Sequence, residues 1–471
     1  MKLQLDPRDL SREKAEDALR GASRFHFTGI GGVGMSALAR ILARQGRTVS
    51  GTDRSDSPRL EQMRLEGVAA EVGHRAEAVH GAEVVVVTTA LTEDNIELVE
   101  ARRLGLPVLH RAELLAAVVN RRPAIAVTGT HGKSTTTALV GHLLAAAGLD
   151  PLVIVGGDVH EWDGNVRFGA GPWAVFEACE SDGTLRLYRD ACQTITSLEP
   201  DHLDRHHSFA ALCDTMARFA ASADPDGFVV YNADSETVRA AVAGSPARLL
   251  GYGRTAGEYR LGRVTARGRE GLSFALRGPS GEVTATMGLY GEHNARNATA
   301  ALAVAQQAGV EVDVAVEALA GFGGVMRRFE LLGRLGESEV FDDYAHHPTE
   351  VRATLRAAKE HLGRPVLVVF QPHLYSRTRD LMGDFVRAFG DADDVIVTRI
   401  YAAREEPIPG VTGEALAEGV AAQRGARPTR FVADFDEMVE SIRPRYRDGW
   451  TVLVMGAGDI RKVGERLVEE G

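Results

Sequence analysis

Cysteine is scarce in this sequence, with three residues among 471. Cys179, Cys192 and Cys213 lie far apart and form no Cys-x-x-Cys pair. The sequence therefore indicates neither a disulfide framework nor a cysteine-based zinc site. Isolated cysteines fit a reducing compartment, and we expect a cytoplasmic protein.

Long apolar runs are missing as well. The longest stretches, such as Val84–Val87 and Ala112–Val119, are too short or too interrupted to cross a bilayer. The segment Met1–Leu10 mixes acidic and basic residues and lacks the apolar core of a signal peptide. We therefore expect no membrane insertion.

Positive charge is in deficit, with 54 Lys and Arg against 65 Asp and Glu and a formal net charge of −11. No long basic run offsets this balance, so the sequence argues against a general nucleic-acid binder. If the ligands are anionic, positive charge has to come from a few residues, from helix N-termini or from metal ions.

The order of the predicted elements indicates an α/β protein with three domains, because 471 residues exceed one ordinary core. We expect these domains over residues 1–120, 121–329 and 330–471. The second domain has a β-rich portion between Leu249 and Leu289, and Gly321–Gly324 is a candidate hinge. The predicted strands are Arg24–Thr28, Thr48–Gly51, Val84–Thr88, Pro107–Leu109, Ala124–Thr128, Trp173–Phe176, Gln193–Ser197, Val366–Phe370, Asp394–Thr398, Arg430–Val432 and Thr451–Met455.

A glycine-rich loop joins the predicted strand Ala124–Thr128 to an Ala/Leu-rich helix. Backbone N–H groups and the helix N-terminus converge there, which suits a phosphate chain. Lys133 would place a point charge on the outer phosphates, and the Ser134 hydroxyl would bind Mg²⁺. The loop is a shortened P-loop, since Val127 stands where the first glycine of that motif falls. The predicted ATP-binding residues here are Gly129, Thr130, His131, Gly132, Lys133, Ser134 and Thr135.

A second glycine-rich loop, Gly29–Gly34, also lies between a strand and a helix. Asp53 ends the next strand, about 20 residues on, where an acid usually meets ribose hydroxyls. This Rossmann-like pattern fits NAD, another nucleotide such as a uridine nucleotide sugar, or merely a tight strand–helix junction. The residues predicted to bind substrate here are Gly29, Gly31, Gly32, Gly34 and Asp53.

Acidic residues follow two buried strands downstream of the P-loop. Glu177 ends the first of them and is predicted to hold the same Mg²⁺ as Ser134. Glu180 and Asp182 are also explained by a solvated acidic turn. His202 lies among acids after the second strand, and it either ligates a second divalent ion or belongs to a surface turn.

Polar clusters recur in the last third of the chain. Asn294 and Asn297 either cap a helix or offer an amide to a purine edge. One arginine of the pair Arg327-Arg328 could reach the γ-phosphate. Arg377 and Arg379 could neutralise carboxylates or phosphates, or simply pair with acids at the surface, and spacing alone does not decide.

In this order the motifs resemble those of the Mur ligase family, from about Phe25 to Gly458. The resemblance implies a Rossmann-like amino-terminal domain for a UDP-sugar, a central P-loop ATPase domain, and a Rossmann-like carboxy-terminal domain that closes over the site. The matching segments are Gly29–Gly34, Gly129–Thr135, Glu177–Asp182, Asp201–Asp204, Gly291–Asn297, Arg327–Glu330, Asp342–Thr349, Gln371–Asp380 and Ile400–Ala403.

The resemblance implies an ATP- and Mg²⁺-dependent ligase of peptidoglycan precursor synthesis. Its reaction would activate the carboxylate of UDP-N-acetylmuramate as an acyl phosphate and join it to L-alanine, in a monomer or homodimer. The implied catalytic residues are Lys133, His202, Arg328 and Asp343; the metal ligands are Ser134, Glu177 and His202; the nucleotide contacts beyond the P-loop are Asn294, Asn297 and Arg328; and the residues toward the substrate are Glu180, Ser181, His346, His347, Arg377 and Arg379.

Some positions depart from the family pattern. Cys179 stands for an aspartate, Ser197 for an asparagine, Leu374 for an arginine, Arg404 for a glycine and Ser134 for a threonine. The carbamylated lysine of many family members has no counterpart. These departures leave the reaction class intact and affect contacts to the substrate.

Three other interpretations stay open at this point. A ligase that attaches a whole tripeptide to the same sugar typically has tyrosine where Ser181 stands. A dehydrogenase would use Gly29–Gly34 for NAD but would leave the P-loop unexplained. A non-catalytic regulator would bind ATP and release no phosphate.

Overall fold

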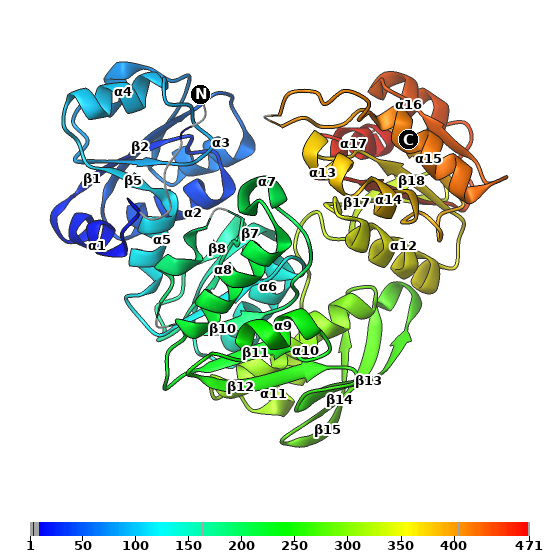
Figure 1. The fold of residues 1–471 in the computed structure, drawn as a ribbon, viewed down its shortest axis with the longest axis horizontal. Helices are drawn as coiled ribbons and strands as arrows, with labels where there is room; N and C mark the ends of the chain where they lie inside the picture. Colours follow the sequence, from blue (N-terminus) through cyan, green and yellow to red (C-terminus); the bar gives the residue numbers. More distant parts are fainter. Residues whose placement is uncertain are drawn as a thin grey trace.

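The computed structural model describes residue 3 and residues 9–162, 164–181, 183–189, 191–403 and 405–469. Asp182 and Arg404, which the sequence singles out, lie outside the described residues. Figure 1 shows an amino-terminal unit (blue) and a carboxy-terminal unit (yellow to red) that both contact a central unit (cyan to green).

The amino-terminal unit is a parallel sheet of order β3-β2-β1-β4-β5. The strand order reverses between β1 and β4, and at such a point the carboxyl ends of parallel strands form a ligand crevice. The loop Gly29–Gly34 leaves β1 there. The elements are α1 (Arg12–Gly21), β1 (Arg24–Thr28), α2 (Val33–Arg44), β2 (Thr48–Asp53), α3 (Pro58–Leu65), β3 (Ala69–Val72), β4 (Val84–Val87), α4 (Ile96–Arg103), β5 (Val108–His110) and α5 (Arg111–Val119).

The central unit contains a sheet of order β15-β14-β13-β12-β11-β10-β6-β9-β7-β8. In this sheet β7, β9, β10, β11, β12 and β13 run parallel with β6. Strand β8 is antiparallel to β7, and β13–β15 form an antiparallel meander. The strands are β6 (Ala124–Thr128), β7 (Leu152–Val159), β8 (Gly164–Arg167), β9 (Ala174–Glu177), β10 (Cys192–Ile195), β11 (Phe228–Asn232), β12 (Arg248–Gly253), β13 (Tyr259–Ala266), β14 (Leu272–Gly278) and β15 (Gly281–Met287). The α-helices are α6 (Lys133–Ala146), α7 (Leu203–His206), α8 (Phe209–Ala221), α9 (Glu236–Val242), α10 (Glu292–Gln307) and α11 (Val312–Leu319).

The carboxy-terminal unit has a sheet of order β16-β17-β21-β18-β19-β20, parallel except for the edge strand β16. Its strands are β16 (Glu330–Leu335), β17 (Ser338–Asp343), β18 (Val366–Phe370), β19 (Asp394–Val397), β20 (Thr429–Phe431) and β21 (Thr451–Met455). Its helices are α12 (Pro348–Leu362), α13 (Tyr375–Asp380), α14 (Met382–Val386), α15 (Gly413–Arg424), α16 (Phe435–Ile442) and α17 (Arg461–Glu469).

The two outer units are attached to the central unit by different chemistry. One apolar core runs without interruption from the amino-terminal unit, with Leu115 of α5, to one face of the central sheet, with Phe176 of β9. The carboxy-terminal sheet has its own apolar clusters on its two faces. Its contacts with the central unit include the hydrogen bonds and ion pairs of Arg377 with Asp201 and of Glu350 with His131.

The predicted α/β fold with three domains is confirmed. Every predicted strand overlaps a strand of the structure, and those at Arg24–Thr28, Ala124–Thr128, Val366–Phe370 and Thr451–Met455 have the predicted bounds. The sequence analysis missed α1, whose stretch is mostly polar, and the edge strand β16, in which only Leu335 is buried. It also named no strand at β7 or β11, although most residues of both are buried. The predicted boundaries near residues 120 and 329 fall between the sheets and remain predictions. No helix in the described part of the chain is long and apolar enough to span a membrane.

The carboxy-terminal core gives a test of the fold. Phe370 of β18 is fully buried, and its ring lies 5.5 Å from that of Phe385 and 5.3 Å from that of Phe389. We expect Phe370→Ala to lower the free energy of unfolding of this unit by roughly 3–5 kcal/mol, because it leaves a cavity. Urea denaturation of the full chain measures this. Leu331→Ala in the same unit is the control, since Leu331 is 53% exposed and its loss should change little.

Candidate active site

The P-loop turns from β6 into α6 through two glycines with positive φ. Gly132 precedes α6 at φ +79°, and a Cβ there would lie 2.5 Å from Oδ1 of Asn297. Gly129 has φ +129°, and a Cβ there would lie 2.3 Å from Oγ1 of Thr196. Only glycine fits both positions. The backbone therefore turns tightly and presents the first N–H groups of α6, which lack partners within a helix, to a ligand.

Lys133 points back across this loop. Its Nζ donates to the carbonyl oxygen of Gly129 at 2.5 Å and lies 2.9 Å from Oε2 of Glu180, which is fully buried. Burial lowers the pKa of Lys133, but Glu180, Cys179 and Glu177 outweigh it and raise the pKa above its ordinary value. The ammonium is therefore charged at any physiological pH and is held beside the loop.

Ser134 and Glu177 lie together, as the sequence predicts. The Ser134 hydroxyl donates to Oε2 of Glu177 at 2.8 Å, and the N–H of Gly156 donates to the same oxygen at 2.8 Å. A hydroxyl and a carboxylate are hard oxygen donors of the kind that Mg²⁺ prefers, so this pair fits the ion. His202 lines one cavity together with Ser134 and Glu177. Burial lowers the pKa of His202, so its neutral ring can donate a lone pair to a metal.

A cavity of about 310 Å³ adjoins the P-loop between the central and carboxy-terminal units. Asn294 and Asn297 of α10 line it. Nδ2 of Asn294 donates to the carbonyl oxygen of Tyr290 at 2.8 Å, and Nδ2 of Asn297 donates to Oδ1 of Asn294 at 3.2 Å. Gly291, not an asparagine, precedes α10, so neither side chain caps the helix. The amide pair is oriented instead at the wall of the cavity.

Arg328 and Asp343 meet at the start of the carboxy-terminal unit and line this cavity too. Asp343 accepts from the N–H of Phe329 at 2.9 Å and from the N–H of Ala345 at 2.7 Å. Burial raises the pKa of Asp343 to about 7, against the opposing effect of Arg328. Phe329 has φ +56°, an uncommon conformation for a side chain of its size. Asp343 thus fixes the turn that carries Arg328.

A larger cavity of about 650 Å³ opens on the other side of the P-loop. Arg377 and His346 line it from the carboxy-terminal unit. Arg377 is 7% exposed and donates through Nε and Nη2 to Oδ1 of Asp201 at 3.1 and 2.8 Å. Burial lowers the pKa of His346 to about 3, so its ring is neutral at pH 7. The predicted residues that line this cavity are Thr130, Gly132, Lys133, Ser134, Glu177, His202, Arg328, His346 and Arg377.

Of the residues predicted to face the substrate from the central and carboxy-terminal units, Glu180, Ser181, His347 and Arg379 do not line this cavity. Arg379 is exposed at the surface and pairs with Asp380 at 2.7 Å. Ser181 lies 3.0 Å from Sγ of Cys179. His347, which caps α12, lies beside His131, with Nε2 3.3 Å from the carbonyl oxygen of Pro200. Spacing in the sequence groups these residues with their neighbours but does not tell which way each one points.

The amino-terminal loop borders a third cavity, of about 340 Å³. Asp53 accepts from the N–H of Gly31 at 2.8 Å, and a Cβ at Gly31 would lie 2.9 Å from the same carboxylate oxygen. His74, Thr88 and Arg111 complete the wall, and no sequence motif marks them. Gly29, Gly32, Gly34 and Asp53, all predicted, line this cavity. Val33 lines both this cavity and the central one, so the two are neighbours.

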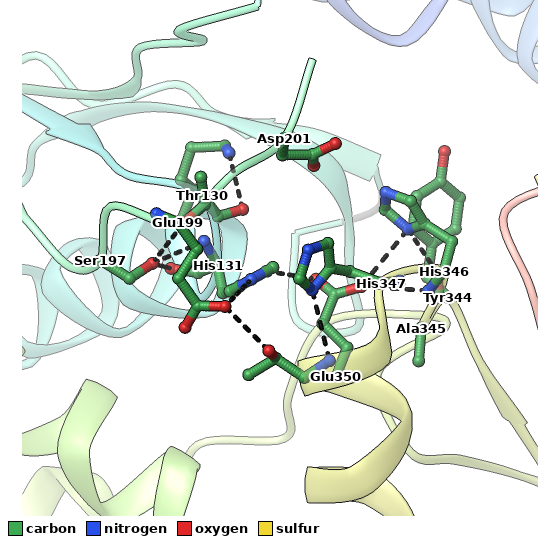
Figure 2. Close-up of polar contacts among 12 residues, drawn as sticks. Thr130, His131, Ser197, Glu199, Asp201, Tyr344, Ala345, His346, His347 and Glu350 are labelled. Atoms are coloured by element: carbon green, nitrogen blue, oxygen red, sulfur yellow. Dashed lines mark hydrogen bonds and ion pairs between the residues drawn. The ribbon is translucent and has the colours of Figure 1, made fainter. Parts of the chain in front are cut away.

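Sequence reasoning also missed a polar cluster between the central and carboxy-terminal units. Figure 2 shows His131 and Glu199 of the central unit facing His347, which caps α12, and Glu350 in the first turn of that helix. Nδ1 of His131 lies 3.1 Å from Oε1 of Glu350, and Nε2 lies 3.5 Å from Oε2 of Glu199. Glu350 is three residues after His347, within one turn of helix, which is the only sequence signal that connects it with the site.

Comparison with known proteins agrees with this arrangement. Three family profiles match consecutive stretches: "Mur ligase family, catalytic domain" over residues 24–123, "Mur ligase middle domain" over 127–305 and "Mur ligase, glutamate ligase domain" over 327–458. The chain belongs to the Mur ligase family.

Individual Mur ligases match over nearly the whole chain. The UDP-N-acetylmuramate–L-alanine ligase of an Anaeromyxobacter species is 42% identical, over 95% of this chain and 97% of its own length. That of Carboxydothermus hydrogenoformans is 40% identical, over 94% and 96%. The crystal structure of the UDP-N-acetylmuramate–alanine ligase of Thermotoga maritima has a TM-score of 0.80 at 29% identity, and the match covers 95% of this chain and 98% of that one.

Gly156 gives a test of the predicted metal ligands. A Cβ at this position would lie 2.6 Å from both carboxylate oxygens of Glu177. We expect Gly156→Ala to displace Glu177 and to raise the Mg²⁺ concentration that half-saturates ATP turnover by about tenfold or more. Titration of phosphate release with Mg²⁺ measures the shift. Gly244→Ala is the control, because its Cβ would meet nothing within 4 Å; an equal shift in both variants would contradict the prediction.

Proposed function

We propose that this protein is an ATP-dependent ligase that joins L-alanine to the carboxylate of UDP-N-acetylmuramate, in the synthesis of peptidoglycan precursors. The observation that carries the proposal is the position of the P-loop between two cavities. Gly132, Ser134 and Arg328 line both cavities, and Lys133, Glu177 and His202 line the larger one. Relatives about 40% identical over nearly the whole chain have this activity in their names.

The reaction has to overcome repulsion between anions. A carboxylate does not react with an amine at neutral pH because oxide is a very poor leaving group. Attack of the carboxylate oxygen on the γ-phosphorus of ATP forms an acyl phosphate and releases ADP. The amine then attacks the acyl carbon and releases phosphate. The carboxylate and the triphosphate of ATP, both anions, approach each other in the first step. Fixed positive charge at the γ-phosphate therefore lowers the barrier of this step.

The charges around the P-loop suit this first step. Lys133 would contact the γ-phosphate, and Arg328, anchored through the turn that Asp343 holds, would neutralise the transferring group. Ser134 and Glu177 would hold one Mg²⁺ and His202 a second, and these ions would supply further positive charge. Asn294 and Asn297 would meet adenine in the cavity of about 310 Å³.

The two substrates enter from opposite units in this proposal. The cavity beside Gly29–Gly34 would take the uridine nucleotide, with Asp53 at the ribose, and the neighbouring central cavity would take the muramoyl carboxylate. Arg377 and His346 would contact L-alanine from the carboxy-terminal unit, with Glu180 holding Lys133 in place. A cytoplasmic location is part of the proposal, and either a monomer or a homodimer is compatible with it.

Phosphate release from the wild-type protein tests this function. With ATP, Mg²⁺ and UDP-N-acetylmuramate, we expect L-alanine to give the fastest release in a screen of amino acids. Lys133→Ala should reduce turnover by a factor on the order of 10² or more while the protein stays folded. Near-normal turnover of this variant would contradict the P-loop assignment. Faster release with L-alanyl-γ-D-glutamyl-meso-diaminopimelate than with L-alanine would indicate the tripeptide ligase, and NAD reduction a dehydrogenase.

The order of the chemical steps has its own test. When both oxygens of the muramoyl carboxylate are labelled with heavy oxygen, we expect one labelled atom per turnover to appear in the released phosphate, because the oxygen that attacks the γ-phosphorus stays on that phosphorus. Mass spectrometry of the phosphate detects it. A mechanism through an adenylate would instead place the atom in AMP. Label that is found in AMP, or that remains wholly in the amide product, would mean that no acyl phosphate forms.

A further inference from the structure

The cluster of His131, Glu199, His347 and Glu350, which we call the docking cluster, lies where the P-loop meets the carboxy-terminal unit. His131 and Glu199 belong to the central unit, whereas His347 caps α12 and Glu350 lies in its first turn (Figure 2). Three further links converge at this spot. Thr349 Oγ1 donates to Glu199 at 2.8 Å, His347 Nε2 lies 3.3 Å from the carbonyl oxygen of Pro200, and the rings of His131 and His347 are 4.6 Å apart.

The geometry favours a doubly protonated His131. Each of its two ring nitrogens faces a carboxylate oxygen, Nδ1 that of Glu350 within hydrogen-bond distance and Nε2 that of Glu199 at the longer distance of an ion pair. A neutral ring has one lone pair, which would point at a negative oxygen, whereas the imidazolium is attracted to both carboxylates. Burial lowers the pKa of His131, but hydrogen bonds to Glu199 and Glu350 outweigh it and raise the pKa to about 9.

A metal ion is the weaker interpretation of the same residues. Ligand atoms of His131, Glu199 and His347 lie within 4.8 Å of one another. However, Nδ1 of His347 accepts from the N–H of Thr349, and its Nε2 lies against the carbonyl oxygen of Pro200. Both nitrogens of His347 are therefore engaged with the backbone, and both nitrogens of His131 face carboxylates. The arrangement is that of a bridging cation, not of a set of free ligands.

The position of the bridge gives it a consequence for ATP. His131, Glu199 and Glu350 all line the cavity of about 310 Å³ beside the P-loop. Two carboxylates there would repel the phosphates of a nucleotide unless a cation neutralised them. The backbone of His131 is fixed as well, since its N–H donates to Oγ of Ser197 at 2.8 Å. One side chain therefore joins the P-loop backbone to the carboxylate of α12.

We propose that His131 is a positioning residue that couples docking of the carboxy-terminal unit to ATP binding, as an imidazolium shared by Glu199 and Glu350. This rests on the proposed ligase function. Docking brings Glu350 to the P-loop, and His131 holds it there while cancelling charge that the nucleotide would otherwise meet. Glu350 also accepts from the N–H groups of His346 and His347, so the bridge is continuous with the N-terminus of α12.

A double-mutant cycle tests the role of charge. His131→Asn leaves two unneutralised carboxylates, and we expect kcat/KM for ATP to fall by about tenfold, chiefly through KM. Glu350→Gln keeps a residue that can complete the helix cap and removes one charge. The double variant should regain at least about threefold over His131→Asn alone, because it removes one of the uncompensated carboxylates. Glu360→Gln, an exposed position on the same helix, should match the wild type.

The pH dependence of docking gives a second measurement that does not need turnover. His131 faces Glu199, Glu350 and the neutral His347, and Glu350 also faces His346 and Arg328. Because the pKa of His131 is raised in the docked arrangement, its stabilisation is complete below the ordinary value near 6.5 and is lost as pH rises through about 9. Small-angle scattering of the full-length wild type should show expansion over that range, and His131→Asn should show no such step.

The two measurements separate the coupling from the ligase activity. If the wild type releases no phosphate with any amine, the proposed function fails, while scattering still tests the coupling. If the ligase is active but the losses of the two single variants simply multiply in the double variant, the charge-coupling role is overturned. A step near pH 9 that persists in His131→Asn overturns it as well. Recovery of kcat/KM for ATP in the double variant, together with loss of the pH-dependent expansion in His131→Asn, would support the coupling.

Discussion

Repulsion between negative charges is the constraint on which the rest of this structure depends. A chain with a formal net charge of −11 has to bring a triphosphate, a pyrophosphate and a carboxylate together. It does so with a small number of cations, each fixed by a neighbouring carboxylate. Glu180 holds Lys133, Asp201 holds Arg377, and Glu199 and Glu350 hold His131. A buried ion pair adds little to stability, but it holds a charge in one place, and a charge that is already in place needs no reorganisation during the reaction.

Most of the fold could be predicted from the sequence, because the parallel strands are short, apolar and bounded by glycine or acidic residues. The same regularity identified the P-loop and placed Glu177 at the end of β9, beside Ser134. The edge strand β16, in which only Leu335 is buried, carries no such period and was missed. Arg111 belongs to no motif and was missed too. Glu350 directly follows the matching segment Asp342–Thr349, but nothing in the sequence shows that it meets the P-loop.

The spacing of residues in the sequence also does not tell in which direction each side chain points. Arg377 and Arg379 are two residues apart on α13, yet one is buried against Asp201 and the other pairs with Asp380 at the surface. His346 and His347 are adjacent, yet they face opposite sides of the P-loop. Arg377 and Arg379 point in different directions because residues two apart on a helix lie on different faces. His346 and His347 lie where the chain enters α12, and their directions differ there too. Only the packing of the surrounding units tells which side chain of each pair faces the cavity.

The shared apolar core has a consequence for how the chain can be divided. Cutting near Asn120 would strip the partner surface from Leu115 and its neighbours on α5 and expose the face of the central sheet around Phe176. Fragments made at that point would expose large apolar surfaces and aggregate. A cut after the Gly321–Gly324 hinge would remove less apolar contact, since Tyr290 is the residue of the central unit that packs against the apolar clusters of the last sheet in the described part of the chain. The amino-terminal and central units therefore share one core, whereas the carboxy-terminal unit has cores of its own. Chimaeras between relatives should exchange domains at the Gly321–Gly324 hinge.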